Sequence, residues 1–123
     1  DLLKQFDAVL ITFGASTDKK LGLEGEDADG VLSAVQFLRN VGRNEIMDLT
    51  GKEVAVIGGG NVSMDAVRTA KRLGAKKVSI VYRSRVAEMT ALAGEIEGAV
   101  AEGIELQTLK APSSIKVNAE NHI

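Results

Sequence analysis

The amino-acid sequence predicts an α/β fold in which a mostly parallel sheet is flanked by helices. Short apolar runs alternate along the chain with segments of helical periodicity. The runs are continuous rather than alternately apolar and polar, which is typical of parallel strands covered on both faces. In addition, three adjacent glycines stand between one apolar run and one helical segment, which indicates a sharp turn from strand to helix.

Four apolar runs predict strands, at residues 6–13, 54–57, 78–82 and 104–109. Residues 115–117 are expected to continue the fourth run beyond Pro112. The last three strands and the two helical segments between them form a βαβαβ unit, because parallel neighbours need a crossover connection.

Three stripes of apolar residues at three- and four-residue spacing predict helices that pack on the core. Asp29 is the expected N-cap of the first helix, and Gly74 and Gly103 are expected to end the second and third. The stripes are Val31, Ala34, Val35, Leu38 and Val41; Val62, Ala66, Ala70 and Leu73; and Met89, Leu92, Ile96 and Val100. The charged face of the second helix, expected in solvent, carries Asp65, Arg68, Lys71 and Arg72.

Composition excludes several classes of function. Lys and Arg number 15 and Asp and Glu 17, so the net charge of −2 argues against general nucleic-acid binding. The chain has no Cys, which excludes disulfides, zinc fingers and cysteine-ligated iron–sulfur clusters within it. Its single His, His122, makes a His-based triad improbable. No apolar run could span a bilayer, so we expect a cytoplasmic protein with no membrane partner.

Two further features concern the organisation of the chain. Residues 16–30 form a polar connection whose acidic side chains do not match the spacing of a calcium-binding loop, so we interpret it as a solvated loop. The chain begins with Asp1 rather than Met, and we therefore expect it to be part of a longer protein.

The glycine cluster carries the clearest functional signal. The run Gly58, Gly59, Gly60, Asn61, Val62 and Ser63 follows a strand and opens a helix, the context that a dinucleotide-binding turn requires. Gly58 permits the tight turn, Gly60 lets a pyrophosphate approach the backbone, and the small Ser63 lets helix and strand pack closely. The free N–H groups of the helix would face the phosphates. The alternative is a turn that only needs tight packing.

The end of the next strand indicates which dinucleotide is bound. Sites for NAD, FAD or S-adenosylmethionine usually place an acid there, but this sequence has Arg83, Ser84 and Arg85. Guanidinium groups suit a 2′-phosphate, which carries a charge of about −1.5 to −2. The pattern therefore favours NADP over NAD and argues against a methyltransferase. The alternative is that both arginines are ordinary solvent-exposed side chains.

These motifs resemble the NADPH-binding domain of the glutamate synthase small (beta) subunit family, which is similar to part of dihydropyrimidine dehydrogenase. The strongest likeness lies in residues 51–85, and the whole covers residues 6–117. The matching positions are Gly58, Gly59, Gly60, Met64, Asp65, Tyr82, Arg83, Met89, Ala91, Glu95, Glu102, Gly103 and Ile104. The chain departs from the family pattern at Phe13, Ser63, Ser84 and Thr90.

The resemblance implies a Rossmann-like domain of a flavoprotein oxidoreductase, in which NADPH gives a hydride to FAD and electrons pass to iron–sulfur clusters or a partner subunit. It implies that residues 1–15 hold a strand from the junction with the flavin domain, residues 16–50 a connecting loop and helix, and residues 51–123 the NADPH-binding unit. Gly14 and Ala15 would approach the nicotinamide or the flavin.

One glycine turn serves one dinucleotide, so FAD and the clusters are expected outside this chain, which we expect to be inactive alone. The implied partners are the remaining flavin domain and a large glutamate synthase-type subunit. An exposed edge strand would allow pairing with a second copy. We assign no catalytic residue and no metal ligand. A stand-alone NAD(P)-sensing regulatory module is the alternative function.

Overall fold

A parallel sheet of three strands organises the molecule. This computed structural model describes residues 1–10, 17–45 and 47–123. Strands β1 (Glu53–Ile57), β2 (Lys77–Tyr82) and β3 (Glu105–Thr108) lie in the order β1-β2-β3, with Ile57 opposite Val81 and Ser79 opposite Glu105. The βαβαβ unit predicted from the sequence is therefore confirmed.

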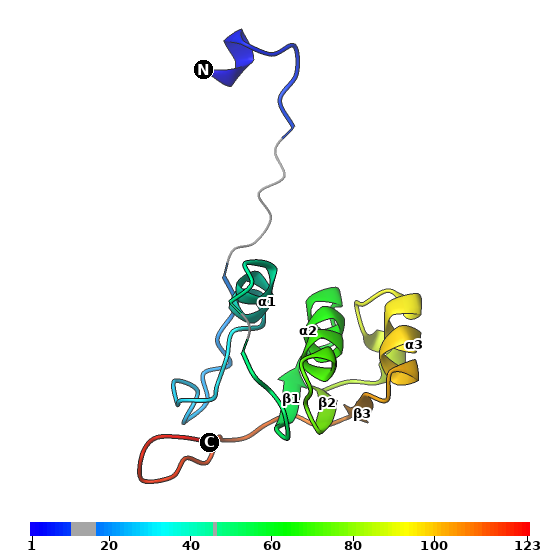
Figure 1. The fold of residues 1–123 in the computed structure, drawn as a ribbon. Helices are drawn as coiled ribbons and strands as arrows, with labels where there is room; N and C mark the ends of the chain where they lie inside the picture. Colours follow the sequence, from blue (N-terminus) through cyan, green and yellow to red (C-terminus); the bar gives the residue numbers. More distant parts are fainter. Residues whose placement is uncertain (11–16, 46) are drawn as a thin grey trace.

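The helices lie on one side of this sheet (Figure 1). They are α1 (Ala34–Gly42), α2 (Asn61–Arg72) and α3 (Ala93–Ala101), and two 3₁₀ turns, η1 (Leu2–Lys4) and η2 (Val86–Glu88), complete the described elements. The opposite face of β1 is open, because its residues are alternately exposed and half-buried. Coverage on both faces, which the continuous apolar runs predicted, is thus not found at β1.

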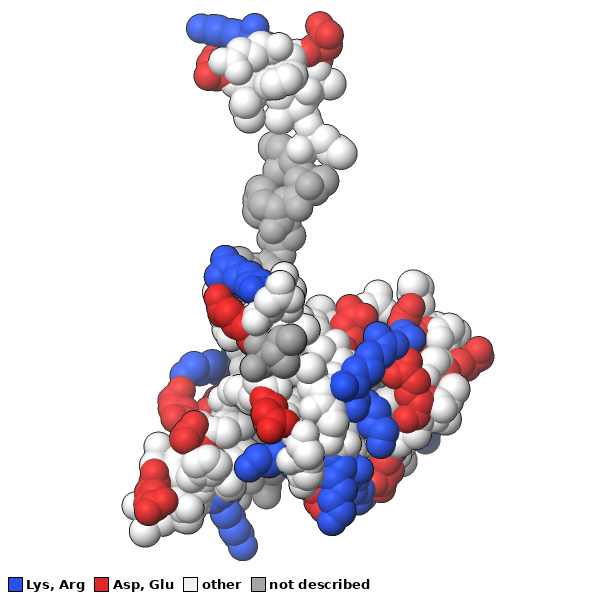
Figure 2. Space-filling model, viewed as in Figure 1, with Lys and Arg blue, Asp and Glu red and all other residues white. Residues whose placement is uncertain are grey.

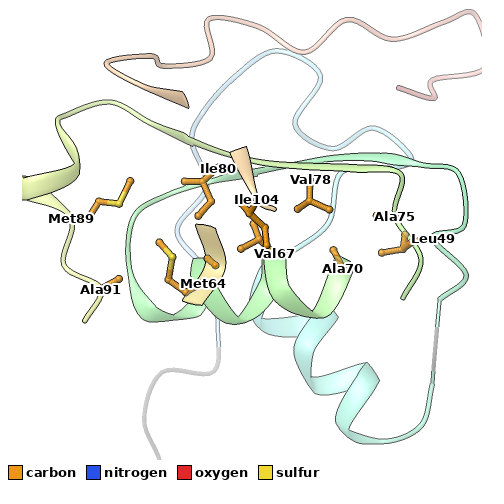
Figure 3. Packing of buried hydrophobic residues seen from close by; sticks show 11 residues of the cluster. Leu49, Met64, Val67, Ala70, Ala75, Val78, Ile80, Met89, Ala91 and Ile104 are labelled. Carbon is orange, nitrogen blue, oxygen red and sulfur yellow. The ribbon is translucent and has the colours of Figure 1, made fainter. Parts of the chain in front are cut away.

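The core lies between β2 and α2 and consists of aliphatic side chains and methionines. Met64 and Val67 on α2 and Val78 and Ile80 on β2 are its largest fully buried side chains. Around them lie Leu49, Ala70, Ala75, Met89, Ala91, Ala99 and Ile104 (Figure 3). This packing fixes α2 against the sheet and therefore fixes the glycine turn that precedes it.

Helix α2 agrees with the prediction in its ends but not in its face. Gly74 follows the helix with φ of +91°, the left-handed conformation of a helix C-terminus. Val62, expected in the core, is 45% exposed, whereas Met64 and Val67 are buried. Ala66 and Ala70 of the predicted stripe are buried as expected, so the buried face of α2 overlaps the predicted one but is rotated toward Met64 and Val67.

The expected start of the third helix is wrong. Met89 is buried, but it lies in extended backbone after η2, and α3 begins only at Ala93. Leu92 and Val100 are exposed, and Ala99 is the buried residue of α3. The reason is that the backbone of residues 91–92 donates hydrogen bonds to the glycine turn instead of entering a helix.

The expected N-cap of the first helix is also wrong. Helix α1 begins after Ser33, whose Oγ accepts a hydrogen bond from Gln36 N at 3.0 Å. Asp29 instead exchanges backbone hydrogen bonds with Asn121 and Ile123. A serine adjacent to the first turn satisfies a free N–H more directly than an aspartate four residues earlier.

Two parts of the predicted strands are not strands in the described residues. Residues 6–10 contain no strand, and the rest of the first run lies outside the described residues. An apolar run becomes a strand only beside a partner, and the described sheet offers residues 6–10 none. Residues 115–117 do not continue β3, because the chain turns at Leu109 with φ of +56° and Ile115 N bonds to Glu24 O.

The surface is of mixed charge. Figure 2 shows basic and acidic side chains interleaved over the side that carries α2 and α3. Within the described residues, no helix combines the length and the apolar character needed to cross a bilayer. The same part of the chain holds no group of acidic or imidazole side chains arranged for a metal ion.

Candidate functional site

The two motifs singled out from the sequence meet at one edge of the sheet. Gly58 follows β1 and its N–H donates to the carbonyl of Val81 in β2 at 3.0 Å. Residues 58–60 therefore lie beside residues 82–85, at the carboxyl ends of parallel strands. Ligands of open α/β sheets collect at this edge.

Gly58 makes the turn out of β1. Its φ is +143°, a backbone conformation that side chains disfavour. A Cβ at this position would lie 2.6 Å from Ser63 Oγ, and Ser63 is buried on α2. A small residue at position 63 and a glycine at position 58 thus let the first turn of α2 pack against the end of β1, as the motif predicted.

Gly59 has a packing role that the sequence did not reveal. A Cβ here would lie 2.7 Å from Tyr82 Cε2 and 3.0 Å from Met89 Cγ, so the ring and the thioether fill the space beside its backbone. Its carbonyl accepts a hydrogen bond from Ala91 N at 3.0 Å. Gly59 therefore joins the turn to the segment that precedes α3.

Gly60 differs from both neighbours, because the protein itself does not require a glycine there. It is the N-cap of α2 with extended backbone, and a Cβ would come no closer than 3.5 Å to its nearest neighbour, Thr90 Oγ1. The N–H groups of Asn61 and Val62 make no hydrogen bond to a described residue. The start of α2 therefore combines open space beside Gly60 with two unpaired N–H donors, and this combination suits the binding of an anion.

Asn61 contributes its side chain to the architecture of the turn. Its Oδ1 accepts a hydrogen bond from Leu92 N at 2.9 Å, which ties the start of α2 to the start of α3. Val62 is exposed on the first turn of α2. The residues that wall the turn, Met89 to Leu92, were not predicted as part of the site; the spacing of Met89 and Leu92 suggested a helix face instead.

The arginine-containing turn after β2 is held by groups other than its guanidinium groups. Tyr82 Oη donates to the carbonyl of Glu88 at 2.8 Å, and the Glu88 carboxylate accepts from Arg85 N at 2.9 Å. Ser84 is half-buried, and its carbonyl accepts from Leu109 N. Arg83 and Arg85 are exposed and form no ion pair with a described residue, so both cations face solvent beside the glycine turn.

An ion-pair cluster joins α2 to α3 behind the site. Arg68 reaches Glu95 through Nη1 and Glu102 through Nε, both at 2.7 Å, and Arg72 also reaches Glu102. The hydrogen bond from Arg68, reinforced by Arg72, lowers the pKa of the Glu102 carboxyl, although partial desolvation opposes the shift. Arg68 was expected in solvent; its side chain is only 26% exposed because it bridges the helices.

Gly14 and Ala15, the two other predicted site residues, lie outside the described residues. The structure thus places two predicted segments, residues 58–63 and residues 83–85, side by side at one edge of the sheet. Whether these residues bind a ligand stays a prediction.

A parallel sheet whose first strand turns through glycines into a helix defines the class of Rossmann-like α/β domains. The chain belongs to the pyridine nucleotide-disulphide oxidoreductase family, whose model matches residues 3–122.

Known relatives support this assignment. The chain is 40% identical over 122 residues to the NADP(+)-dependent formate dehydrogenase subunit beta of Moorella thermoacetica, covering 98% of this chain and 17% of that protein. It is 38% identical over 133 residues to the glutamate synthase [NADPH] small chain of Escherichia coli, and the match covers 100% of this chain and 28% of that protein. The resemblance to the glutamate synthase small subunit is therefore confirmed, and the chain spans less than a third of either relative.

Solved structures agree on the fold. Thioredoxin reductase of Lactococcus lactis superposes with a TM-score of 0.65 at 22% identity, over 85% of this chain and 32% of that one. A ferredoxin reductase of Rhodopseudomonas palustris superposes with a TM-score of 0.60 at 19% identity, over 85% of this chain and 26% of that one. These similarities confirm the Rossmann-like fold predicted from the sequence.

Proposed function

We propose that this chain is the NADP(H)-binding domain of a flavin-dependent oxidoreductase that resembles the glutamate synthase small subunit. The observation that carries the proposal is the meeting of the open space at Gly60 with the unpaired Arg83 at one edge of the sheet. The first feature suits a pyrophosphate, and the second suits a 2′-phosphate.

The residues present fit this cofactor. A Cβ on Gly60 would project into the space that a pyrophosphate needs, and the N–H groups of Asn61 and Val62 are available as donors. Arg83, with Ser84 or Arg85, would hold the 2′-phosphate. When bound, NADPH supplies a hydride, and this chain's part is to position it. Gly14 and Ala15 remain our candidates for the nicotinamide end.

The longer protein would supply the rest of the chemistry. Three of the relatives are subunits or chains named for NADPH or NADP(+): the two given above and the NADPH-Fe(3+) oxidoreductase subunit beta of Geobacter sulfurreducens, 38% identical over 128 residues. We propose that FAD and iron–sulfur clusters bind outside this chain. Within it, residues 51–123 would form the NADPH-binding unit, preceded by a junction strand (1–15) and a connecting loop and helix (16–50). A flavin domain and a further subunit would be its partners in the cytoplasm.

Calorimetric titration of the chain with NADPH and NADH tests the proposal. A hydrogen bond to a charged group contributes roughly 1.5–3 kcal/mol, so one or two contacts to the 2′-phosphate predict a preference for NADPH of about ten- to several-hundred-fold. Arg83→Ala should remove the preference. Arg43→Ala, which removes an exposed arginine at the end of α1, should keep it. Equal affinities in the unmodified chain would refute the NADP assignment.

A further inference from the structure

We infer that the hydroxyl of Thr90 is a further binding group of this site, which donates a hydrogen bond to the pyrophosphate of the dinucleotide. The inference rests on the proposed function and adds a residue from outside the glycine turn. The sequence marked Thr90 only as a departure from the family pattern. Its place in the fold gives it a role.

The first observation concerns the space beside Gly60. Apart from Gly60 and its two chain neighbours, Thr90 Oγ1 is the only described atom within 4 Å of the point that a Cβ on Gly60 would occupy, at 3.5 Å. A pyrophosphate that uses the missing Cβ to approach the backbone would therefore enter a space bordered by this hydroxyl. Asn61 N–H and Val62 N–H open from the adjacent first turn of α2.

The second observation is that Thr90 is held firmly while its own side chain is not engaged. Met89 before it is buried against Gly59. After it, Ala91 N bonds to the carbonyl of Gly59 and Leu92 N to Asn61 Oδ1. Thr90 itself is exposed, and its hydroxyl has no hydrogen-bond partner among the described residues.

These contacts pre-organise a donor at little cost on binding. The neighbours of Thr90 are fixed by the same turn that the ligand would contact, so the backbone beside it needs no reordering. A hydroxyl offers one donor and can rotate toward an anionic oxygen. A hydrogen bond to a charged phosphate is stronger than one between neutral groups.

The test compares Thr90→Val, which keeps the branched shape but loses the hydroxyl, with Thr90→Ser, which keeps the hydroxyl. Calorimetry would measure the Kd of each variant for NADPH and for NADH. Thr90→Val should weaken both dinucleotides by about tenfold or more, because both contain the pyrophosphate. The ratio of the two Kd values should not change, and Thr90→Ser should retain most of the affinity. The thermal unfolding midpoint of each variant checks that it folds.

The outcomes separate this inference from the proposed function. If the unmodified chain prefers NADPH but Thr90→Val binds both dinucleotides as tightly as the unmodified chain, the assignment of Thr90 is wrong and the proposed function stands. A change in the ratio of Kd values would place the hydroxyl at the 2′-phosphate instead and also overturn the inference. If the unmodified chain binds neither dinucleotide, the proposed function and this inference both fail.

Discussion

Gly59 and Gly60 are neighbours in one turn, yet a methyl group would meet different surroundings at each. At position 59 it would collide with the ring of Tyr82, which lies in contact with the core. At position 60 it would make only an ordinary contact with an exposed threonine. The fold therefore requires a glycine at position 59. At position 60 packing does not require one, and the open space there suits a ligand.

We therefore predict that Gly59→Ala and Gly60→Ala separate stability from binding. Gly59→Ala should lower the free energy of unfolding by about 1–3 kcal/mol, the usual cost of overpacking. Gly60→Ala should stay within about 1 kcal/mol of the unmodified chain, since a weaker N-cap and a stiffer unfolded chain oppose each other. It should nonetheless weaken NADPH binding. Urea unfolding and calorimetry measure the two effects.

A matched control lies on α3. Beyond its chain neighbours and its own helix backbone, no described atom lies within 4 Å of the Cβ position of Gly94, so Gly94→Ala should stabilise the chain by up to about 1 kcal/mol through helix propensity. If Gly60→Ala proves as destabilising as Gly59→Ala, then packing rather than a ligand explains the glycine at position 60.

At the scale of the elements, α2 and α3 are joined at both ends of their contact. The Asn61 side chain connects the beginning of each helix, and Arg68 connects the body of α2 to Glu95 and Glu102. Arg72 adds a more exposed contact to Glu102. The wall of the glycine turn thus depends on how these two helices pack.

The cluster predicts a pH dependence of stability. Arg68 lowers the pKa of Glu102 below its ordinary value of 4.5, so the folded state binds the proton less tightly than the unfolded state. The stabilisation is then complete above the ordinary pKa and is lost as the pH falls through the lowered one. Thermal unfolding between pH 7 and pH 3 should show this loss for the unmodified chain.

Glu102→Gln should lower the thermal midpoint at pH 7 by a few degrees and weaken its dependence on pH below 5. Glu97→Gln is the control, because Glu97 is exposed on the same helix and has no ion pair with a described residue. A Glu102→Gln variant with the same acid dependence as the unmodified chain would contradict this account.

At the scale of the whole molecule, the hydrophobic cluster lies between Leu49 and Ile104. The backbone hydrogen bonds of residues 1–10 that involve described residues stay within that segment. At the other end, Ile115 N bonds to Glu24 O and Ile123 N to Asp29 O, so residues 115–123 hold the 24–30 loop. The two ends of the chain should therefore contribute unequally to stability.

Deletion of residues 1–10 should shift the thermal midpoint by less than about 2 °C, because it removes no contact with the core. Deletion of residues 115–123 should lower the midpoint further and expose the 24–30 loop to protease, because it removes the hydrogen bonds that Ile115, Asn121 and Ile123 make with that loop. Thermal unfolding and limited proteolysis of the two truncated chains check this order. A larger loss of stability on removing residues 1–10 would show that they dock on the domain.

Much of the fold was predictable because its signals are local. The glycine turn, the ends of α2 and the three parallel strands each follow from a few consecutive residues. The N-cap of α1 was missed although its signal is local, since Ser33 caps Gln36 N three residues later. The start of α3 and the pairing of Asp29 were not predictable, because Leu92 bonds to Asn61, which lies 31 residues away, and Asp29 bonds to the other end of the chain. Such partners leave no periodic trace in the sequence.

The sequence by itself determined the order of strands and helices and the position of the turn, since apolar spacing and glycine act on their immediate neighbours. Only the tertiary structure decided that Gly59 serves packing, that Gly60 leaves open space, and that Thr90 borders that space. It also decided that Arg68 bridges two helices while Arg83 is left to solvent. The physical reason is that burial and hydrogen bonding depend on which distant segments the sheet brings together, and side-chain type alone does not specify them.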